Sequence, residues 1–113
     1  MTEPMHFPAL LPDGWRDLPY RPFAEGVEIA SLRAADPAVA LLRYAPGASV
    51  PRHEHTGLET ILVLEGAQSD ERGFYPTGTL VLNPVGSVHS VWSEQGCTVL
   101  IQWERPVRFI DQD

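Results

Sequence analysis

Three histidines and one glutamate are the residues of this chain whose types and spacing could support chemistry. His53 and His55 are two residues apart, Glu59 follows four residues later, and His89 lies in a later segment. Neutral imidazoles and a carboxylate suit Fe, Mn, Ni, Co, Cu or Zn, and the spacing alone does not choose among these metals. The four side chains are therefore candidate metal ligands. A metal with open coordination positions would polarise or activate a bound molecule.

The elements that must position these ligands are β-strands. Successive residues of a strand point to opposite faces, so the imidazoles of His53 and His55 share one face. Residues 56–58 can turn the chain so that Glu59 starts the next strand beside them, and His89 starts a strand that returns across the same barrel. Four such ligands leave about two open positions in an octahedral centre and none in a tetrahedral one. The coordination geometry would thus separate a catalytic site from a structural one.

The rest of the chain favours an all-β fold. Its 11 prolines and 9 glycines interrupt short runs of Val, Ile, Leu, Thr and aromatic residues, a pattern typical of a sandwich or a barrel. Between these runs, residues 69–73 predict a polar hairpin tip and residues 75–78 predict a turn. We predict strands at 27–33, 38–44, 60–65, 79–83, 89–93 and 98–103.

The same pattern divides the chain into two parts. Residues 1–25 are rich in proline and show little alternation, so we predict an extended N-terminal arm that wraps the barrel or a partner. Trp15 and Phe23 of this arm are expected to pack on the sheet. Residues 26–113 are predicted to form a small single-domain barrel.

Length and composition exclude several classes of function. The 113 residues fit one domain, and 43% hydrophobic residues fit a globular one. A net charge of −7 argues against nucleic acid and against anionic membrane surfaces as partners. The single cysteine, Cys97, cannot form an internal disulfide, and we expect it to be a small buried hydrophobic residue. No signal peptide or membrane-spanning run is apparent, so we expect a soluble cytoplasmic protein.

Glycines and prolines around the candidate ligands extend the pattern to a family resemblance. The chain resembles the cupin superfamily, whose motifs are G-x5-H-x-H-x3-E-x6-G and G-x5-P-x-G-x2-H-x3-N. The first motif is matched at Gly47, His53, His55, Glu59 and Gly66. The second is matched at Gly78, Pro84, Gly86 and His89, with Ser93 in place of the final asparagine. That asparagine is not usually a ligand, so the departure leaves the four candidate ligands unaffected.

Longer segments resemble the ChrR-type group of cupins. The similarity covers about residues 26–103 and includes E-T-I-L-V-L-E-G, S-D-E-R-G-F-Y-P-T-G-T and N-P-V-G-S-V-H-S. It implies a jelly-roll cupin barrel with a divalent transition metal, Zn, Fe, Mn or Ni, of which zinc or iron is favoured. ChrR anti-sigma factors also carry an N-terminal helical domain that holds the sigma factor through its own zinc site. Residues 1–25 do not resemble that domain, so we do not expect sigma-factor inhibition.

Three functions remain open. The first is a metal-dependent module that binds or senses a small molecule. The second is an Fe(II) dioxygenase acting on a small diketone-like or aromatic substrate, as the resemblance to related cupins implies, with Glu59 either a ligand or a base. The third is a structural barrel whose site is empty or holds inert zinc. We also expect a homodimer formed through the N-terminal arm or the first strands, because an exposed edge strand is otherwise a liability.

A few further side chains carry predictions of their own. Residues 70–72 are expected to form a solvated hairpin tip. Phe74 and Tyr75 either flank that tip on the surface or line the barrel mouth. Arg43 and Arg52 either hold a substrate carboxylate or form surface salt bridges.

Overall fold

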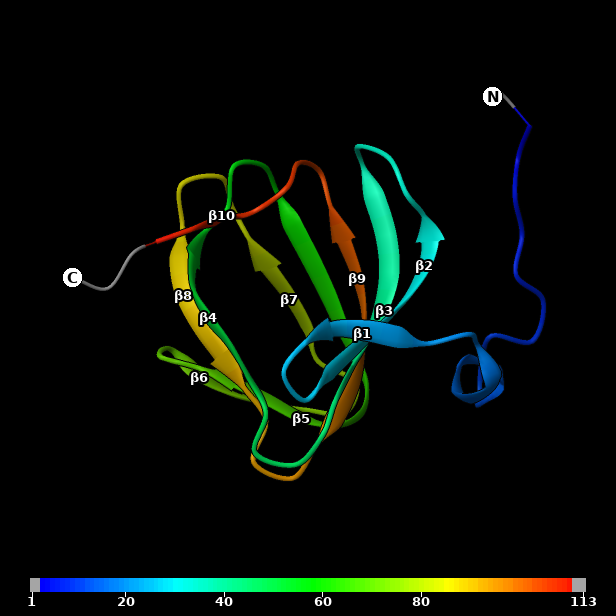
Figure 1. Ribbon diagram of the computed structural model, residues 1–113, viewed down its shortest axis with the longest axis horizontal. Helices are drawn as coiled ribbons and strands as arrows, with labels where there is room; N and C mark the ends of the chain where they lie inside the picture. Colours follow the sequence, from blue (N-terminus) through cyan, green and yellow to red (C-terminus); the bar gives the residue numbers. More distant parts are fainter. Residues whose placement is uncertain (1–2, 111–113) are drawn as a thin grey trace.

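The computed structural model describes residues 3–110 of the chain. In this range the elements are a 3-10 helix, η1 (Gly14–Asp17), and the strands β1 (Arg21–Ala24), β2 (Val27–Arg33), β3 (Ala38–Tyr44), β4 (Ser49–Glu54), β5 (Glu59–Asp70), β6 (Gly73–Pro76), β7 (Leu80–Asn83), β8 (Val88–Trp92), β9 (Cys97–Trp103) and β10 (Arg108–Phe109). The predicted all-β barrel is confirmed, because the strands curl around one interior (Figure 1). Residues 1–2 of the predicted arm and 111–113 of the predicted barrel lie outside the described residues. None of the described helices is long and apolar enough to cross a membrane.

One strand, β5, belongs to both walls of the barrel. The strands follow the order β1-β2-β3-β9-β5-β8-β4-β10, with β6 and β7 also paired to β5. The first part of β5, up to Gly66, pairs with β9 and β7. Its last part, from Ala67, pairs with β6 and β8. A single strand thus joins the β1-β2-β3-β9 wall to the β8-β4-β10 wall.

A glycine permits the bend of β5 between the two walls. Gly66 has a φ of 72°, in the left-handed region that favours glycine. A Cβ added at Gly66 would lie 2.1 Å from the carbonyl oxygen of Gly96, which no side chain could tolerate. The glycine that follows the candidate ligands in the first motif therefore serves the fold directly.

The strand predictions agree with six strands of the structure and miss β4 and three shorter ones. Strands β2 and β3 have the predicted bounds, and the predicted strand at 60–65 extends to Glu59–Asp70. Strands β1, β6 and β10 have four, four and two residues and were not predicted. Pro22 and Pro76 lie in the first two. These segments are extended because a longer neighbour supplies hydrogen bonds, which local propensity does not reveal.

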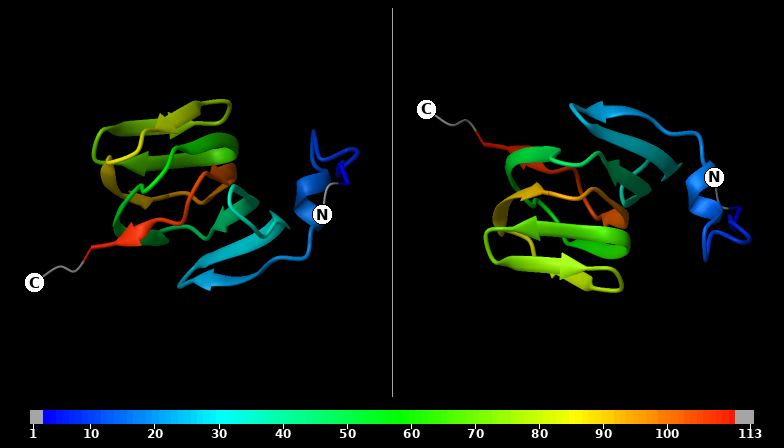
Figure 2. Two further views of the ribbon diagram at one scale, coloured as in Figure 1. Left: turned by 90° about the horizontal axis from the view of Figure 1, so that it is seen from above. Right: turned by 90° about the horizontal axis from the view of Figure 1, so that it is seen from below.

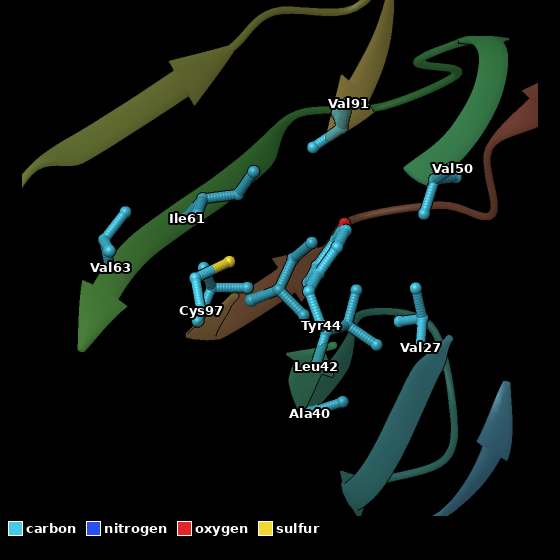
Figure 3. Packing of buried hydrophobic residues seen from close by; sticks show 11 residues of the cluster. Val27, Ala40, Leu42, Tyr44, Val50, Ile61, Val63, Val91 and Cys97 are labelled. Carbon is cyan, nitrogen blue, oxygen red and sulfur yellow. The ribbon is translucent and has the colours of Figure 1, made fainter. Parts of the chain in front are cut away.

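Apolar, mostly aliphatic side chains fill the interior of the barrel. Their inward faces follow the alternation of each strand, and Figure 3 shows them converging from both walls around the ring of Tyr44. Cys97 is buried among them, as predicted, and burial raises the pKa of its thiol to about 11. The cluster consists of Val27, Ala40, Leu42, Tyr44, Val50, Ile61, Val63, Val91, Cys97, Val99 and Ile101.

A second apolar row crosses the outer face of the sheet. The strand registers set its members side by side, from the edge strand β7 to β2. The end of the row near β2 is covered, because Leu41 is fully buried. The end at β7 is exposed to solvent, because Leu80 is 58% exposed. The row consists of Leu80, Leu62, Leu100, Leu41 and Ala30.

The N-terminal segment covers the end of this row near β2. Trp15 is 2% exposed and packs with Ala30 and Leu41 on the outer face of the sheet, and Figure 2 shows η1 outside the barrel near β2 and β3. The indole Nε1 donates to the Pro12 carbonyl at 3.1 Å, and the Tyr20 hydroxyl donates to the Trp15 carbonyl at 2.8 Å. Trp15 therefore anchors residues 10–20 to the sheet.

We expect Trp15→Ala to lower the free energy of unfolding by about 3–5 kcal/mol, because it empties a buried aromatic site. Urea denaturation followed by circular dichroism measures this change. Phe7→Ala is the matched control, since Phe7 lies in the same segment but is 41% exposed, and its effect should stay within about 0.5 kcal/mol. Equal effects of the two substitutions would show that Trp15 does not anchor the segment.

Candidate metal centre

The structure brings the four candidate ligands together at one end of the barrel interior. One donor atom from each of His53, His55, Glu59 and His89 lies within 4.8 Å of every other. All four residues are at least 97% buried. Strands β4 and β8 place His53 and His89 opposite each other, and His55 follows the end of β4.

The route by which Glu59 reaches the cluster differs from the prediction. We expected Glu59 to start a strand beside the histidine strand, but β4 pairs with β8 and β10 and not with β5. Glu59 is the first residue of β5 and pairs with Asn83 and Trp103 in the opposite wall. The carboxylate therefore faces the imidazoles across the interior, so that the cluster spans both walls.

A hydrogen bond at Nδ1 fixes the orientation of each imidazole. An oxygen atom accepts from each Nδ1–H, so each ring presents Nε2 and its lone pair to the cluster. The pairs are His53 with the Pro51 carbonyl at 2.7 Å, His55 with the Ser87 hydroxyl at 2.8 Å, and His89 with Asp70 Oδ2 at 2.9 Å. The Ser87 hydroxyl donates its own proton to the Pro84 carbonyl at 2.6 Å and so accepts from His55.

Asp70 is the functional residue that the sequence analysis missed. We expected it on a solvated tip, but its side chain is buried and binds His89 from inside the barrel. Its Oδ1 also accepts from the Tyr75 hydroxyl at 2.7 Å and from the backbone N–H groups of Arg72 and Gly73. Burial raises the pKa of Asp70, but the hydrogen bond from His89 and the other donors outweigh burial and hold it below the usual value. The turn that Asp70 begins, Asp-x-x-Gly, gave no signal of this role, because the same pattern occurs in solvated turns.

The Glu59 carboxylate is held by two hydrogen bonds from its own wall. Asn83 Nδ2 donates to Oε1 at 3.0 Å, and Trp103 Nε1 donates to Oε2 at 2.7 Å. Burial raises the pKa of Glu59, yet the neighbouring His55 and His89 and the Trp103 donor lower it by more. The carboxylate is thus kept ionised and aimed at the imidazoles. Burial also lowers the pKa of His53, which favours its neutral, ligating form.

Two orphaned nitrogens show that this cluster fits a cation. Nε2 of His55 and Nε2 of His89 are buried and have no hydrogen-bond partner. They lie 3.0 and 3.8 Å from Glu59 Oε1, with poor geometry for a hydrogen bond to it. Unpaired buried acceptors are costly, and a metal ion among them removes that cost. The residues present therefore fit a divalent transition metal with nitrogen and oxygen ligands.

The C-terminal strand, which was not predicted, lies against the cluster. Strand β10 pairs with β4 so that Phe109 is opposite His53, and the two ring centroids are 5.7 Å apart. Thr56 Oγ1 donates to the Pro106 carbonyl at 2.6 Å, which ties the preceding loop to the turn after His55. The segment at 106–109 thus forms part of the wall around the centre.

Other candidate residues lie outside the site. Arg43 forms a salt bridge with Glu28 at 2.9 Å, and Arg52 is exposed, so neither reaches the cluster. Phe74 is 63% exposed on the surface, whereas Tyr75 is partly buried and binds Asp70. Ser93, which replaces the motif asparagine, is buried and donates to the Ala67 carbonyl at 2.6 Å, which is a structural role.

Known proteins share this architecture. The chain is 35% identical over 96 residues to the anti-sigma-E factor ChrR of Cereibacter sphaeroides, across 82% of this chain and 45% of that protein. The crystal structure of Rhodobacter sphaeroides SigE in complex with the anti-sigma ChrR is similar with a TM-score of 0.72 and 31% identity, across 77% of this chain and 50% of that chain. The chain therefore spans about half the length of these relatives.

The barrel also resembles enzymes of lower identity. An acetylacetone dioxygenase from Acinetobacter johnsonii has a TM-score of 0.77 and 18% identity, across 82% of this chain and 72% of that chain, which shows a common fold alone. The family model of the ChrR cupin-like domain matches residues 14–105. This match takes in most of the chain and all four clustered residues. The chain is therefore a member of the ChrR cupin-like domain family.

Proposed function

We propose that this protein is a metal-binding cupin that binds or senses a small molecule at a centre made by His53, His55, Glu59 and His89. The observation that carries the proposal is the pair of buried, orphaned Nε2 atoms beside the buried carboxylate of Glu59. The metal is proposed to be zinc or iron, with manganese and nickel as further candidates, because three imidazoles and one carboxylate accommodate all of these ions.

Different residues of the chain would bind the ion and orient the residues that bind it. The three imidazoles and Glu59 would hold the ion, and the groups behind them keep each donor atom in place. Asn83 and Trp103 orient Glu59, and Asp70 orients His89. A bound metal of this kind acts as a Lewis acid toward an oxygen atom of a ligand. The apolar interior would exclude water and so strengthen that interaction.

A second candidate function is an iron-dependent dioxygenase acting on a small diketone-like or aromatic substrate. The observation that favours it is a cavity that reaches His53 and Glu59 and has mostly apolar walls. Such a cavity would admit an apolar substrate to the metal. Sigma-factor binding is not proposed, because the complex with SigE is known for a chain of which this one spans half.

We expect the protein purified without added metal to contain on the order of one transition-metal ion per chain, and His55→Ala or His89→Ala to lose it. Elemental analysis measures the content, and circular dichroism confirms that each variant is folded. His6→Ala is the control, because His6 is exposed in the N-terminal segment.

Stoichiometric metal in the folded His55→Ala variant would refute the ligand assignment. The identity of the ion separates the two candidate functions. Zinc would favour binding or sensing, and iron would call for oxygen-uptake assays with diketone and aromatic substrates.

We expect Asp70→Asn to weaken metal affinity about 10- to 100-fold, because the carboxylate that orients His89 and raises its basicity becomes a neutral amide. Competition with a chromophoric chelator measures this affinity. Glu94→Gln removes an exposed carboxylate and should leave the affinity unchanged. Equal affinities for the Asp70→Asn variant and the native protein would mean that Asp70 has no part in positioning His89.

We also propose the expected homodimer, but through the exposed end of the outer apolar row and not through the N-terminal arm or the first strands, because Trp15 packs that arm on its own barrel. Leu80 and Leu82 project from β7 and are each 58% exposed, and the β7 register puts Leu62 and Thr60 beside them. This surface has no charged member, so a contact between two copies there brings no like charges together directly, although each chain has a net charge of −7. Strand β7 pairs with β5 alone among the described strands and so has a free edge for a symmetric partner.

We expect the native chain to be a dimer at micromolar concentration and Leu82→Glu to be a monomer, because two glutamates would be buried face to face. Size-exclusion chromatography with light scattering measures the mass. Phe74→Glu changes a similarly exposed apolar residue on β6 and should leave the dimer intact. A native monomer would rule out the proposal.

A cytoplasmic location without a nucleic-acid partner is proposed for the same protein. Cys97 is a buried free thiol, which suits a reducing compartment. Acidic residues outnumber basic ones by 15 to 8, which disfavours phosphate backbones.

A further inference from the structure

The candidate ligands lie where bulk solvent hardly reaches them. Each of His53, His55, Glu59 and His89 is at least 97% buried. Packed side chains leave no passage for an ion, so an ion that enters or leaves has to displace part of the surrounding wall. The question is which part of the wall moves.

A C-terminal strap, residues 104–110, lies beside the segment that holds His53 and His55. Figure 1 shows it leaving the end of β9 and crossing to β4. Its two-residue strand, β10, pairs with β4 and with no other described strand. The strap is therefore an edge of the wall around the cluster.

The antiparallel register of β10 and β4 continues well beyond β10. Three further hydrogen bonds join residues that lie opposite each other in the register set by Arg108 and Glu54. They run from the Ile110 N–H to the Arg52 carbonyl at 3.1 Å, from the Thr56 hydroxyl to the Pro106 carbonyl at 2.6 Å, and from the Glu104 N–H to the Leu58 carbonyl at 3.0 Å. The strap thus follows the whole of residues 52–58, although only two of its residues form a strand.

The strap is held to the barrel from the outside. Residues 107 and 110 are partly buried and its other residues are exposed, whereas β4, β5, β8 and β9 all contain buried side chains. Segments with few buried contacts and exposed hydrogen bonds open at a lower free energy than the core. The strap can therefore separate from β4 without disrupting the packed interior.

Phe109 connects the strap to the cluster. Its ring lies against His53, with ring centroids 5.7 Å apart, and it lines the cavity that reaches His53 and Glu59. Phe109 is 53% exposed, so moving it outward exposes little additional apolar surface. Phe23 of β1 also borders the cavity, but its ring stacks on Trp103 and not on a candidate ligand.

We propose that residues 104–110 form a gate, and that the ion enters and leaves the centre when this strap separates from residues 52–58. The inference rests on the proposed metal centre and adds the control of access to it. None of the hydrogen bonds at the three imidazole Nδ1 atoms involves the strap. The candidate ligands therefore keep their orientation when the strap opens, and the gate controls the rate of exchange more than the affinity.

The test locks the strap shut and measures how fast the ion leaves. Glu54→Cys combined with Arg108→Cys replaces an antiparallel pair, whose Cα atoms lie within reach of a disulfide. The full chain is loaded with Co²⁺, and the loss of its visible absorption is followed after excess chelator is added. The oxidised and reduced forms of the same variant are compared. We expect oxidation to slow the release of Co²⁺ by about tenfold or more.

A second cross-link is the matched control. Glu28→Cys combined with Arg43→Cys replaces another antiparallel, ion-paired couple, on β2 and β3 away from the cluster. Its oxidation should leave the release rate unchanged. In both variants Cys97 is buried, so it does not compete for the new thiols, and the spectrum before chelator is added shows whether the centre is intact.

Phe109→Ala tests the gate without a disulfide. It removes the ring that covers His53, so we expect both the uptake and the release of Co²⁺ to become several-fold faster while the affinity changes less than either rate. A purely structural role of Phe109 would instead lower the affinity along with any change in release. Phe74→Ala is the control, because Phe74 is an exposed phenylalanine on β6.

The outcomes separate the gate from the metal centre. Failure of the native chain to take up Co²⁺ would refute the metal centre itself. Uptake of Co²⁺ with equal release from the oxidised and reduced Glu54→Cys/Arg108→Cys variant, or equal slowing by both cross-links, would overturn the gate alone. If thiol titration shows that the cross-link has not formed, Phe109→Ala decides, and native rates in that variant would overturn the gate.

Discussion

The hydrogen bonds at the three imidazole Nδ1 atoms are the interactions on which the candidate centre depends. A buried histidine can present either nitrogen, and the acceptor at Nδ1 decides which one carries the proton. Here a carbonyl, a hydroxyl and a carboxylate make that choice for His53, His55 and His89. As a result, the Nε2 atoms of the three imidazoles face Glu59 in a buried part of the barrel. Such a convergence is unfavourable for the protein alone and favourable around a cation.

The bend of β5 is what makes this convergence geometrically possible. Glu59 and Asp70 are the two ends of this strand, and both contact His89. Glu59 Oε1 lies 3.8 Å from Nε2 of His89, and Asp70 Oδ2 lies 2.9 Å from Nδ1. A straight strand would hold its ends tens of ångströms apart, so the turn at Gly66 brings a candidate ligand and a second carboxylate to opposite sides of one imidazole. The strand connects the fold to the chemistry of the site.

The barrel interior has two distinct parts, a polar cluster of candidate ligands and a cluster of apolar side chains. The candidate ligands have their hydrogen-bond partners behind them, while the cavity in front of them is lined mostly by aliphatic and aromatic side chains, with Tyr44 and Gln68 adding polar groups. Low polarity strengthens electrostatic interactions, so the apolar walls would strengthen the binding of an ion held by the cluster. The outer face of the sheet is apolar for a different reason. Its apolar row packs against the N-terminal segment at one end, and at the other end Leu80 and Leu82 are exposed to solvent.

The sequence by itself determined the types of the candidate ligands, the all-β class, the family resemblance and the bounds of β2 and β3. These follow from residue chemistry, fixed spacing and the twofold alternation of a strand, all of which are local. Tertiary structure decided that Glu59 faces the histidines from the opposite wall, that Asp70 is buried behind His89, and that β1, β6 and β10 are strands. Each of these depends on pairing between residues far apart in the chain. A polar residue in a turn, such as Asp70, has the same local pattern whether it faces solvent or a buried imidazole, so only the folded chain distinguishes the two.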